Sequence, residues 1–273
     1  MKTKNIYISL MALFLLAAMI FGGVWFYQSR DAVASEEAFN ELEDMIVQPT
    51  GNLNEPETDE SATGDEEISE ESTEPIDDEI AEALAAQAQY QALYEQNDEF
   101  VGWIKIENTM ISYPVMQSID NPDFYLKHGF DKGYSNYGVP YIDEACATGL
   151  SNNIVIYGHN MKNGSMFSDL TKYSSQNYYE SHPVIQFDTL TQLSEYQIVC
   201  VFRFDTNNET FRFNEYTDMN EEKFAEYMAN CYERQLYDTG VTAEYGDELI
   251  TLSTCEYTYE NGRFIVVAKK IVE

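Results

Sequence analysis

A cysteine and an arginine stand where strands are expected to end and to begin. Cys255 closes a run of β-branched and aliphatic residues at 248–255, and Arg263 opens the next such run at 263–268. The Asn-Gly pair at 261–262 predicts a tight turn between them. Antiparallel pairing would then bring a thiol and a guanidinium to one end of a sheet. A thiolate is a good nucleophile, and a guanidinium can stabilise the oxyanion that forms when a carbonyl is attacked. These residue types indicate acyl-transfer chemistry.

His159 is the histidine best placed to serve such a thiol. It follows an apolar strand expected at 154–157 and Gly158, so its imidazole would stand at a strand end and face the rim of a neighbouring strand. His128 and His182 lie in segments expected to be surface loops. The pattern favours His159 as the base that would act with the cysteine.

Each of these residues also has an ordinary structural interpretation. A lone histidine after a strand is more often structural than catalytic, and a lone cysteine is usually a small buried apolar residue. Arg263 could pair with one of the many acids at the surface. The four cysteines, Cys146, Cys200, Cys231 and Cys255, could form two disulfides in an exported protein. Their wide spacing fits no zinc site.

Charge and composition exclude one class of partner. The chain has 273 residues and a formal net charge of -33, and it carries no Lys or Arg from residue 31 to residue 104. A nucleic-acid-binding role is not expected, because phosphate contacts need a basic face. Aromatic residues make up 14% of the chain, with 21 Tyr, which is typical of a β-rich globular part. No metal and no organic cofactor are expected.

The N-terminal part predicts a membrane anchor. Residues 1–5 form a short basic start, and residues 6–27 are apolar and uncharged, long enough to cross a bilayer as a helix. Lysines before the span and acids after it predict a cytoplasmic N-terminus and an extracellular remainder. A cleaved signal peptide is the alternative, since residues 32–34 resemble a small-residue cleavage site. The apolar run is longer than a signal core of about 7–15 residues, which favours the retained anchor.

A spacer is expected between this anchor and the folded domain. Residues 28–79 are rich in Glu, Asp, Ser, Thr and Pro, and the stretch 54–79 has too little apolar surface to offset the entropy of ordering the chain. We expect a disordered acidic spacer, with a helical turn or two over residues 38–47. The acids lack the spacing of a calcium-binding loop.

Residues 80–273 are expected to form one folded domain. Strong helix formers at helical spacing predict a helix over residues 80–94, and an apolar face predicts another over 220–235. Short strands bounded by Asn, Gly, Pro and Asp are expected at 101–106, 111–116, 139–143, 154–157, 184–187, 196–204, 248–255 and 263–268, with a helical segment at 165–172. This pattern is typical of a mainly β, barrel-like domain with peripheral helices and not of a parallel α/β sheet.

Several of these segments resemble the sortases, cysteine transpeptidases of Gram-positive bacteria. Thr-Leu-Ser-Thr-Cys at 251–255 resembles their active-site strand, and Tyr-Gly-His-Asn at 157–160 resembles their catalytic histidine region. Arg263 matches their arginine, and the order His, Cys, Arg agrees. The single N-terminal anchor agrees in type.

Other segments are similar to the class B branch. They are Gly-Trp-Ile at 102–104, Ile-Ser-Tyr-Pro-Val at 111–115, Asp120-Asn121 followed by Tyr125-Leu126, and the helix at 220–235 before the cysteine strand. The resemblance covers residues 80–272, and several separate motifs agree in order and spacing. It implies a closed β-barrel with an N-terminal helix and a long helix before the cysteine strand.

The resemblance also implies a reaction and its partners. Cys255 would attack the backbone carbonyl of Thr in a C-terminal sorting signal of the Asn-Pro-x-Thr or Ser-Pro-x-Thr type, giving a thioacyl enzyme. His159 would protonate the departing amine and then deprotonate the incoming one, and Arg263 would bind the signal and the oxyanion. The clients would be surface proteins that bear the signal. The acceptor would be an amine of a peptidoglycan precursor or of a pilin.

The residues expected to contact the signal are Asn121, Leu126, Ser253 and Glu256. The chain departs from the family in one respect, because some relatives have been assigned a catalytic Asp shortly after the cysteine. Here Glu256 and Tyr257 follow, so a Cys-His-Asp triad has no obvious third member, whereas a Cys-His-Arg arrangement needs none. The resemblance implies that the other three cysteines are ordinary buried or semi-buried thiols.

Two other interpretations compete with this one. A papain-like protease uses the same chemistry, but it places Cys before His and surrounds the Cys with a glycine-rich signature that is missing here. A non-catalytic, membrane-anchored β module that binds surface proteins or wall polymers fits the acidic spacer and the tyrosines equally well. The set Cys255, His159 and Arg263 discriminates between them, because a binding module has no reason to bring these residues together.

Overall fold

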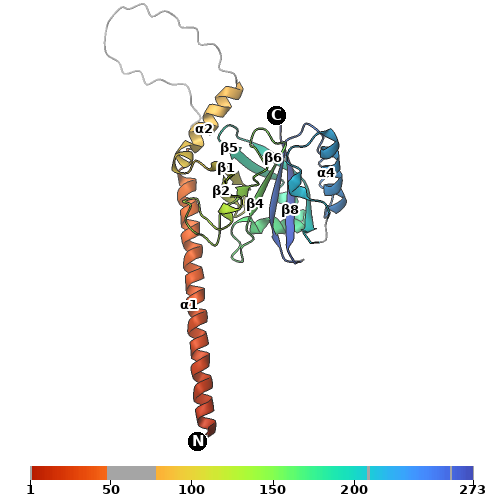
Figure 1. The fold of residues 1–273 in the computed structure, drawn as a ribbon. Coiled ribbons are helices and arrows are strands. Elements are labelled where there is room, and N and C mark those ends of the chain that lie inside the picture. Colours follow the sequence, from red (N-terminus) through yellow and green to blue (C-terminus); the bar gives the residue numbers. More distant parts are fainter. Residues whose placement is uncertain (1, 48–77, 208–209, 259, 273) are drawn as a thin grey trace, which may run out of the picture.

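The computed structural model describes residues 2–47, 78–207, 210–258 and 260–272. Among these residues, eight strands close into a barrel in the order β1-β2-β3-β4-β7-β8-β6-β5 (Figure 1). Their bounds are β1 (Phe100–Lys105), β2 (Ser112–Met116), β3 (Tyr141–Ile142), β4 (Asn153–Gly158), β5 (Val184–Thr189), β6 (Glu195–Asp205), β7 (Leu249–Glu256) and β8 (Gly262–Lys270). The mainly β barrel expected from the sequence is confirmed, with small differences at the strand ends.

Helices surround the barrel. They are α1 (Lys2–Asp44), α2 (Asp78–Gln96), α3 (Gln176–Ser181), α4 (Glu221–Arg234) and the short 3-10 helices η1 (Phe124–Leu126), η2 (Phe167–Ser174) and η3 (Phe213–Glu215). The helix α4 begins where the side chain of Asn220 accepts a hydrogen bond from the backbone of Lys223. The two longer helices of the folded domain match the expected ones. The shorter elements α3, η1 and η3 were not expected, because so few residues carry no periodic signal.

The register of β7 brings chemistry-bearing residues to one end of the barrel. β7 pairs in parallel with β4, with Gly158 opposite Thr254, and antiparallel with β8, with Cys255 opposite Arg263. Strand partners directly opposite each other present their side chains on the same face of the sheet. The carboxyl ends of β4 and β7 and the amino end of β8 therefore meet.

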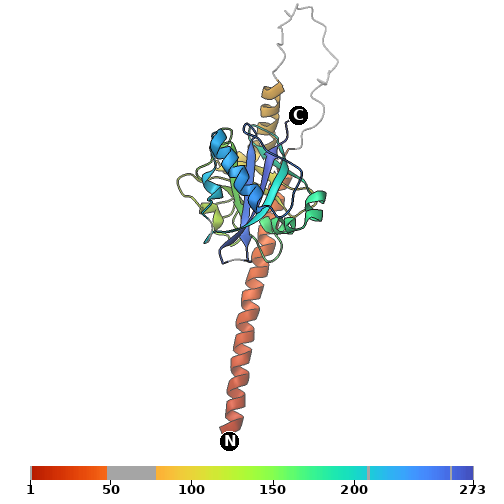
Figure 2. The ribbon, with the colours of Figure 1, turned by 90° about the vertical axis from the view of Figure 1, so that its right-hand side faces the viewer.

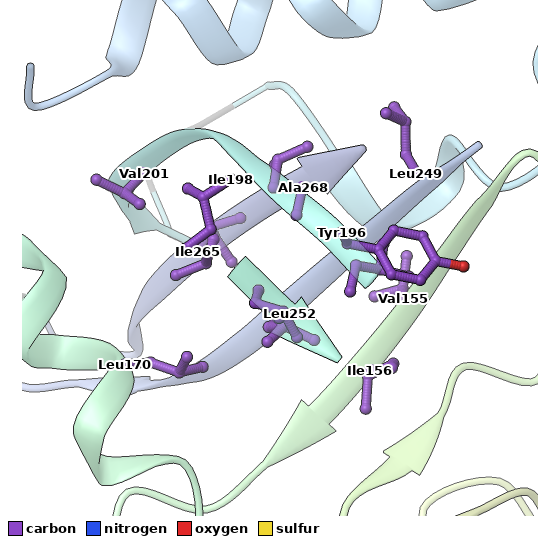
Figure 3. Packing of buried hydrophobic residues seen from close by; sticks show 14 of the residues in the cluster. Val155, Ile156, Leu170, Tyr196, Ile198, Val201, Leu249, Leu252, Ile265 and Ala268 are labelled. Atoms are coloured by element: carbon purple, nitrogen blue, oxygen red, sulfur yellow. The ribbon is translucent and has the colours of Figure 1, made fainter. Parts of the chain in front are cut away.

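β7 is covered on both faces, which explains its nearly unbroken apolar run. On one face, the hydroxyl of Tyr227 from α4 lies 2.6 Å from Thr251 Oγ1. On the other, Leu252 lies in the core among side chains of β4, β6, β8 and η2, several of which are labelled in Figure 3. A strand covered on both sides needs apolar residues at almost every position. Such packing fixes the end of β7, where Cys255 lies.

Helix α1 continues beyond the expected anchor. Residues 28–44 are helical, which agrees with the short helix expected within residues 38–47. The disordered spacer expected from residue 28 onward is wrong for this stretch, because the last turns of the helix pack against the barrel. The Phe39 ring meets the Tyr113 ring edge-on at 5.1 Å, Leu42 is only 8% exposed, and Ser112 Oγ donates to Glu43 at 2.9 Å. Burial of one face stabilises the helix, while Glu36, Glu37, Glu41 and Asp44 stay in solvent. The remainder of the expected spacer, from residue 48 to residue 77, lies outside the described residues.

The outer part of α1 projects away from the barrel (Figure 1). Among the described residues, one helix is long and apolar enough to cross a membrane by length and composition, and its span of Leu13–Asp44 belongs to α1. The 18-residue window that meets this test is not buried inside the molecule. Helix α1 thus combines an apolar outer part with a docked inner part.

Candidate active site

The structure brings Cys255, His159 and Arg263 to one pocket. All three line a cavity of about 400 Å³ at the end of the barrel where β4 and β7 finish and β8 begins. His159 directly follows β4, and Cys255 is the second-last residue of β7, so the parallel register sets them side by side. Arg263 lies opposite Cys255 on β8. The predicted convergence of these side chains is present in the geometry.

A backbone carbonyl orients the imidazole of His159. The Nε2 atom lies 2.7 Å from the carbonyl oxygen of Leu126, the last residue of η1. A carbonyl can only accept, so Nε2 carries the proton and Nδ1 of the neutral ring is left to accept one. This contact provides the orientation that a carboxylate gives in a Cys-His-Asp triad. The imidazole is therefore oriented without the aspartate that some relatives have after the cysteine.

The pKa of His159 is lowered from its ordinary value. Burial disfavours the charged ring most strongly, and the positive charge of Lys127 acts in the same direction. The hydrogen bond to Leu126 opposes both effects, because it also stabilises the imidazolium. At neutral pH the resting ring is therefore mainly neutral, and it becomes charged when it takes a proton during a reaction.

Replacing Lys127 with Gln should raise the pKa of His159, because the substitution removes a positive charge that disfavours imidazolium. A titration of the His159 ring protons by NMR measures this directly. Lys127 is exposed, so added salt should raise the pKa of His159 in the wild type and have less effect in Lys127→Gln. A lowered pKa in the variant would show that Lys127 does not act through its charge.

Hydrogen bonds tie the His159 segment to the cysteine strand. Asn160 Nδ2 donates to the carbonyl of Cys255 at 2.8 Å, and Thr254 Oγ1 donates to the carbonyl of Gly158 at 2.7 Å. On the other side, the backbone N–H of Phe167 donates to the carbonyl of His159 at 2.8 Å. These contacts hold the imidazole and the thiol in a fixed relation, which is the requirement for efficient proton transfer.

Gly158 makes room for this arrangement. A Cβ atom at this position would lie 2.5 Å from the ring of Phe167, a fully buried residue of η2. The backbone of the glycine thus passes closer to the aromatic ring than any other residue type allows. This close approach fixes the backbone position of the next residue, His159.

Gly158→Ala should lower the free energy of unfolding by about 1–3 kcal/mol, because the new methyl group must displace a packed ring. Urea unfolding of the variant measures the loss. In a Phe167→Leu background, Gly158→Ala should lower the free energy of unfolding by less than it does in the wild type, since the smaller side chain gives the methyl group space. A Gly158→Ala protein as stable as the wild type would contradict the steric account.

Two tyrosine–carboxylate pairs form one wall of the pocket. Tyr141 donates to Asp123 Oδ1 and Tyr157 donates to Asp143 Oδ2, both at 2.6 Å. Burial and the neighbouring carboxylates raise the pKa of both phenols, so both remain neutral donors. Asp123 immediately precedes η1, whose last carbonyl orients His159. The hydrogen bond between Tyr141 and Asp123 therefore holds η1, the element that positions the imidazole, against the wall of the pocket.

The residues expected to contact a substrate divide into two groups. Leu126 and Ser253 line the pocket, and Ser253 Oγ is buried without a hydrogen-bond partner among the described residues. Asn121 is exposed and does not line the pocket. Glu256 also stays out of it, because alternation along β7 turns its side chain away from that of Cys255. Its Oε1 lies 3.6 Å from Arg203 Nε.

Several pocket residues were not predicted from the sequence. Asp123, Tyr141, Asp143 and Tyr157 belong to the wall just described, and a second wall comes from the end of β6 and the segment after it: Phe204, Thr206, Arg212, Phe213 and Asn214. Arg212 adds a second guanidinium to the lining. The sequence offered a partial signal for Tyr157, which stands two residues before His159, but no local pattern marked the others.

The cysteines differ in access. All four are free, and only Cys255 is partly exposed, whereas Cys146, Cys200 and Cys231 are buried. Burial raises the pKa of Cys146 to about 12. Among the four thiols, Cys255 is the one that a substrate can reach.

Comparisons with known proteins relate the chain to one family. A family model described as the sortase domain matches residues 104–271. The chain is similar to sortase B of Listeria monocytogenes, with 34% identity over 188 residues that cover 66% of this chain and 73% of the relative. It is also similar to the structure of a Staphylococcus aureus sortase B–substrate complex, with 30% identity, a TM-score of 0.61, and coverage of 68% and 85% of the two chains. A sortase B complexed with triglycine has 29% identity, a TM-score of 0.62, and coverage of 68% and 86%.

Proposed function

This chain belongs to the sortase family, in its class B branch of cysteine transpeptidases, and from that premise we propose that Cys255, His159 and Arg263 carry its reaction. The observation that supports the proposal is the shared pocket, because three strand ends bring a reachable thiol, an oriented imidazole and a guanidinium to one cavity. A binding module would not need this set.

The proposed reaction proceeds in two acyl transfers. His159 takes the proton of the Cys255 thiol, and the resulting thiolate attacks the carbonyl carbon of Thr in the sorting signal. The Arg263 guanidinium stabilises the oxyanion that forms. The C–N bond of the signal breaks while His159 gives a proton to the departing amine, leaving a thioester on Cys255. An incoming amine then gives its proton to His159 and attacks the thioester. A new C–N bond forms, the C–S bond of the thioester breaks, and His159 returns its proton to the departing Cys255 thiolate.

The pocket is suited to a short extended peptide and not to a large ligand. Leu126 and Phe213 offer apolar surface, while Ser253, two residues before Cys255 on β7, has a hydroxyl without a hydrogen-bond partner among the described residues. We propose that it accepts a signal of the Asn-Pro-x-Thr or Ser-Pro-x-Thr type at the C-terminus of surface proteins. The acceptor is an amine of a peptidoglycan precursor or of a pilin. The relative crystallised with a substrate and the one complexed with triglycine support a peptide signal and an amine acceptor.

We also propose that residues 6–27 anchor the enzyme in the cell membrane, with residues 1–5 in the cytoplasm and the barrel outside. The support is the apolar outer part of α1 and the lysines that precede it. Residues 80–273, with the docked end of α1, then form the extracellular catalytic unit.

Fluorogenic signal peptides test the function. Peptides with Asn-Pro, Ser-Pro or Leu-Pro before x-Thr would be incubated with the enzyme, with and without triglycine. We expect cleavage after Thr, an acyl adduct on Cys255 in the mass spectrum of the enzyme, and a peptide joined to triglycine when the amine is present. Cleavage without any adduct on Cys255 would overturn the mechanism, and cleavage at another residue would overturn the signal.

A further inference from the structure

The docked part of α1 begins very close to the end of its apolar part. Tyr27 closes the apolar run, and Asp31 lies just over one helical turn beyond it, about 6 Å along the axis. Asp31 already contacts the barrel domain, because Asn136 Nδ2 donates to Asp31 Oδ2 at 3.0 Å. Further contacts follow at Phe39 and Glu43. The helix therefore leaves no free length between the apolar run and the domain.

The loop that contacts Asp31 presents an exposed aromatic residue. The loop covers residues 131–137 and follows η1 and Lys127. Tyr134 is 69% exposed, and its hydroxyl donates to Asn136 Oδ1 at 2.9 Å, so the ring is tied through Asn136 to Asp31 of α1. Tyrosine is enriched at membrane–water interfaces, because its ring is apolar and its hydroxyl is polar. A large exposed ring at this height on the helix has the chemistry of an interfacial contact.

The active-site end of the barrel faces the same way. The turn between β7 and β8, next to Cys255 and Arg263, lies at the end of the barrel toward which the outer part of α1 projects, and the end of β8 lies at the opposite end (Figures 1 and 2). The two perpendicular views agree. The active-site pocket includes Leu126, which directly precedes Lys127 and the loop 131–137.

We propose that α1 and the loop 131–137 seat the barrel on the lipid headgroups, with the active-site end facing the membrane. The partner of this surface is the bilayer itself. The inference rests on the proposed anchoring of α1. Docking against the barrel makes residues 31–44 of α1 a rigid support that continues directly from the anchor. The pocket therefore stays close to the membrane, within reach of substrates that are themselves held there.

Charge is not the force that holds this surface. The loop carries Asp131 beside Lys132, and Lys132 is paired with Glu99 at 2.9 Å. Such a surface has little net attraction for anionic lipid. The aromatic ring and the fixed height of the domain provide the contact, so we expect the same seating on neutral and anionic vesicles.

Photocrosslinking of the full chain in vesicles tests the proposal. The photoreactive residue p-benzoyl-phenylalanine would replace Tyr134 in one protein and Leu150 in another, in vesicles of phosphatidylcholine with or without phosphatidylglycerol. Leu150 is a matched control, because it is 84% exposed and lies near the opposite end of β4, away from the pocket. We expect at least tenfold more lipid adduct at position 134 than at position 150, in both vesicle types.

Lengthening the helix supplies a second test. Seven alanines inserted between Gln28 and Ser29 would raise the domain by about 10 Å while nearly preserving its rotation. The lipid adduct at position 134 should fall to the level seen at position 150, and the rate of cleavage of a soluble signal peptide should stay within about twofold. Equal adducts at 134 and 150, or an adduct at 134 that survives the insertion, would overturn the seating.

Membrane association is measured separately, so that a failure of the proposed anchor can be distinguished from a failure of the proposed contact between loop 131–137 and the lipid headgroups. The chain should float with the vesicles and resist extraction at alkaline pH. A chain that is extracted would overturn the anchor, and the seating with it. A chain that stays in the vesicles while position 134 takes up no more lipid than position 150 would overturn only the seating.

Discussion

Replacing Cys255 with Ala should abolish both cleavage of a sorting signal and transfer to an amine, with kcat/KM falling on the order of 10³-fold or more. Cys255 is the one thiol of the four that a substrate can reach, and the proposed thioester needs it. The decrease should appear in kcat and in the loss of the acyl adduct, while binding of the peptide persists. Stopped-time assays with mass spectrometry of the enzyme measure all of these effects.

A matched variant separates chemistry from packing. Cys231 is also free, but it is fully buried on α4, away from the pocket, and Cys231→Ala should keep the adduct and nearly all of the activity. A methanethiosulfonate reagent should modify one thiol per folded chain in the wild type and none in Cys255→Ala. Activity that survives Cys255→Ala would eliminate the proposed mechanism.

Replacing Arg263 with Lys should lower kcat/KM by roughly 10²–10³-fold, the usual cost of losing an oxyanion donor. The guanidinium lines the pocket opposite Cys255, and its Nη1 is held by the carbonyl of Gly262 at 3.0 Å. No carboxylate among the described residues forms an ion pair with it, so other N–H groups of the fork are available for a substrate oxygen. Lysine keeps the charge but not the planar fork.

The appropriate control is Arg203→Lys. Arg203 lies on the neighbouring strand β6, its Nε is 3.6 Å from Glu256, and it does not line the pocket. Its replacement should change kcat/KM by less than about threefold. Equal losses in the two variants would show that the β7–β8 end of the barrel is merely destabilised, and an unaffected Arg263→Lys would remove the guanidinium from the reaction. Steady-state kinetics with urea unfolding of each variant distinguish these cases.

The convergence of Cys255, His159 and Arg263 on one pocket was predictable because each of these residues has a local signal. The Asn-Gly pair allows Asn261 its left-handed backbone, with φ at 63°, and so brings Cys255 opposite Arg263. His159 follows an apolar strand and a glycine that permits a close approach. Alternation along β7 was enough to place Ser253 beside Cys255, and it was also enough to turn Glu256 away. The expectation that Glu256 reaches the pocket did not apply this alternation.

Contacts between distant segments could not be predicted in this way. Tyr141 and Asp123 pair through a turn and an unusual backbone angle at Asp123, where φ is 62°. Helix α1 extends to Asp44 because Phe39 and Leu42 find the barrel, whereas composition alone indicated a solvated acidic spacer. The carbonyl of Leu126 that orients His159 carries no side-chain signature. Each of these depends on a partner that only the folded chain supplies.

The parallel pairing of β4 with β7 has a consequence for the order in which the protein folds during synthesis. β7 enters the barrel between β4, made about a hundred residues earlier, and β8, which also closes against β6. Contacts of such long sequence separation form slowly, and a chain made from its N-terminus obtains these two strands last. Until β7 takes its place beside β4, Cys255 does not have His159 beside it. The nascent protein thus carries an idle thiol, and its reactivity begins only when the barrel closes.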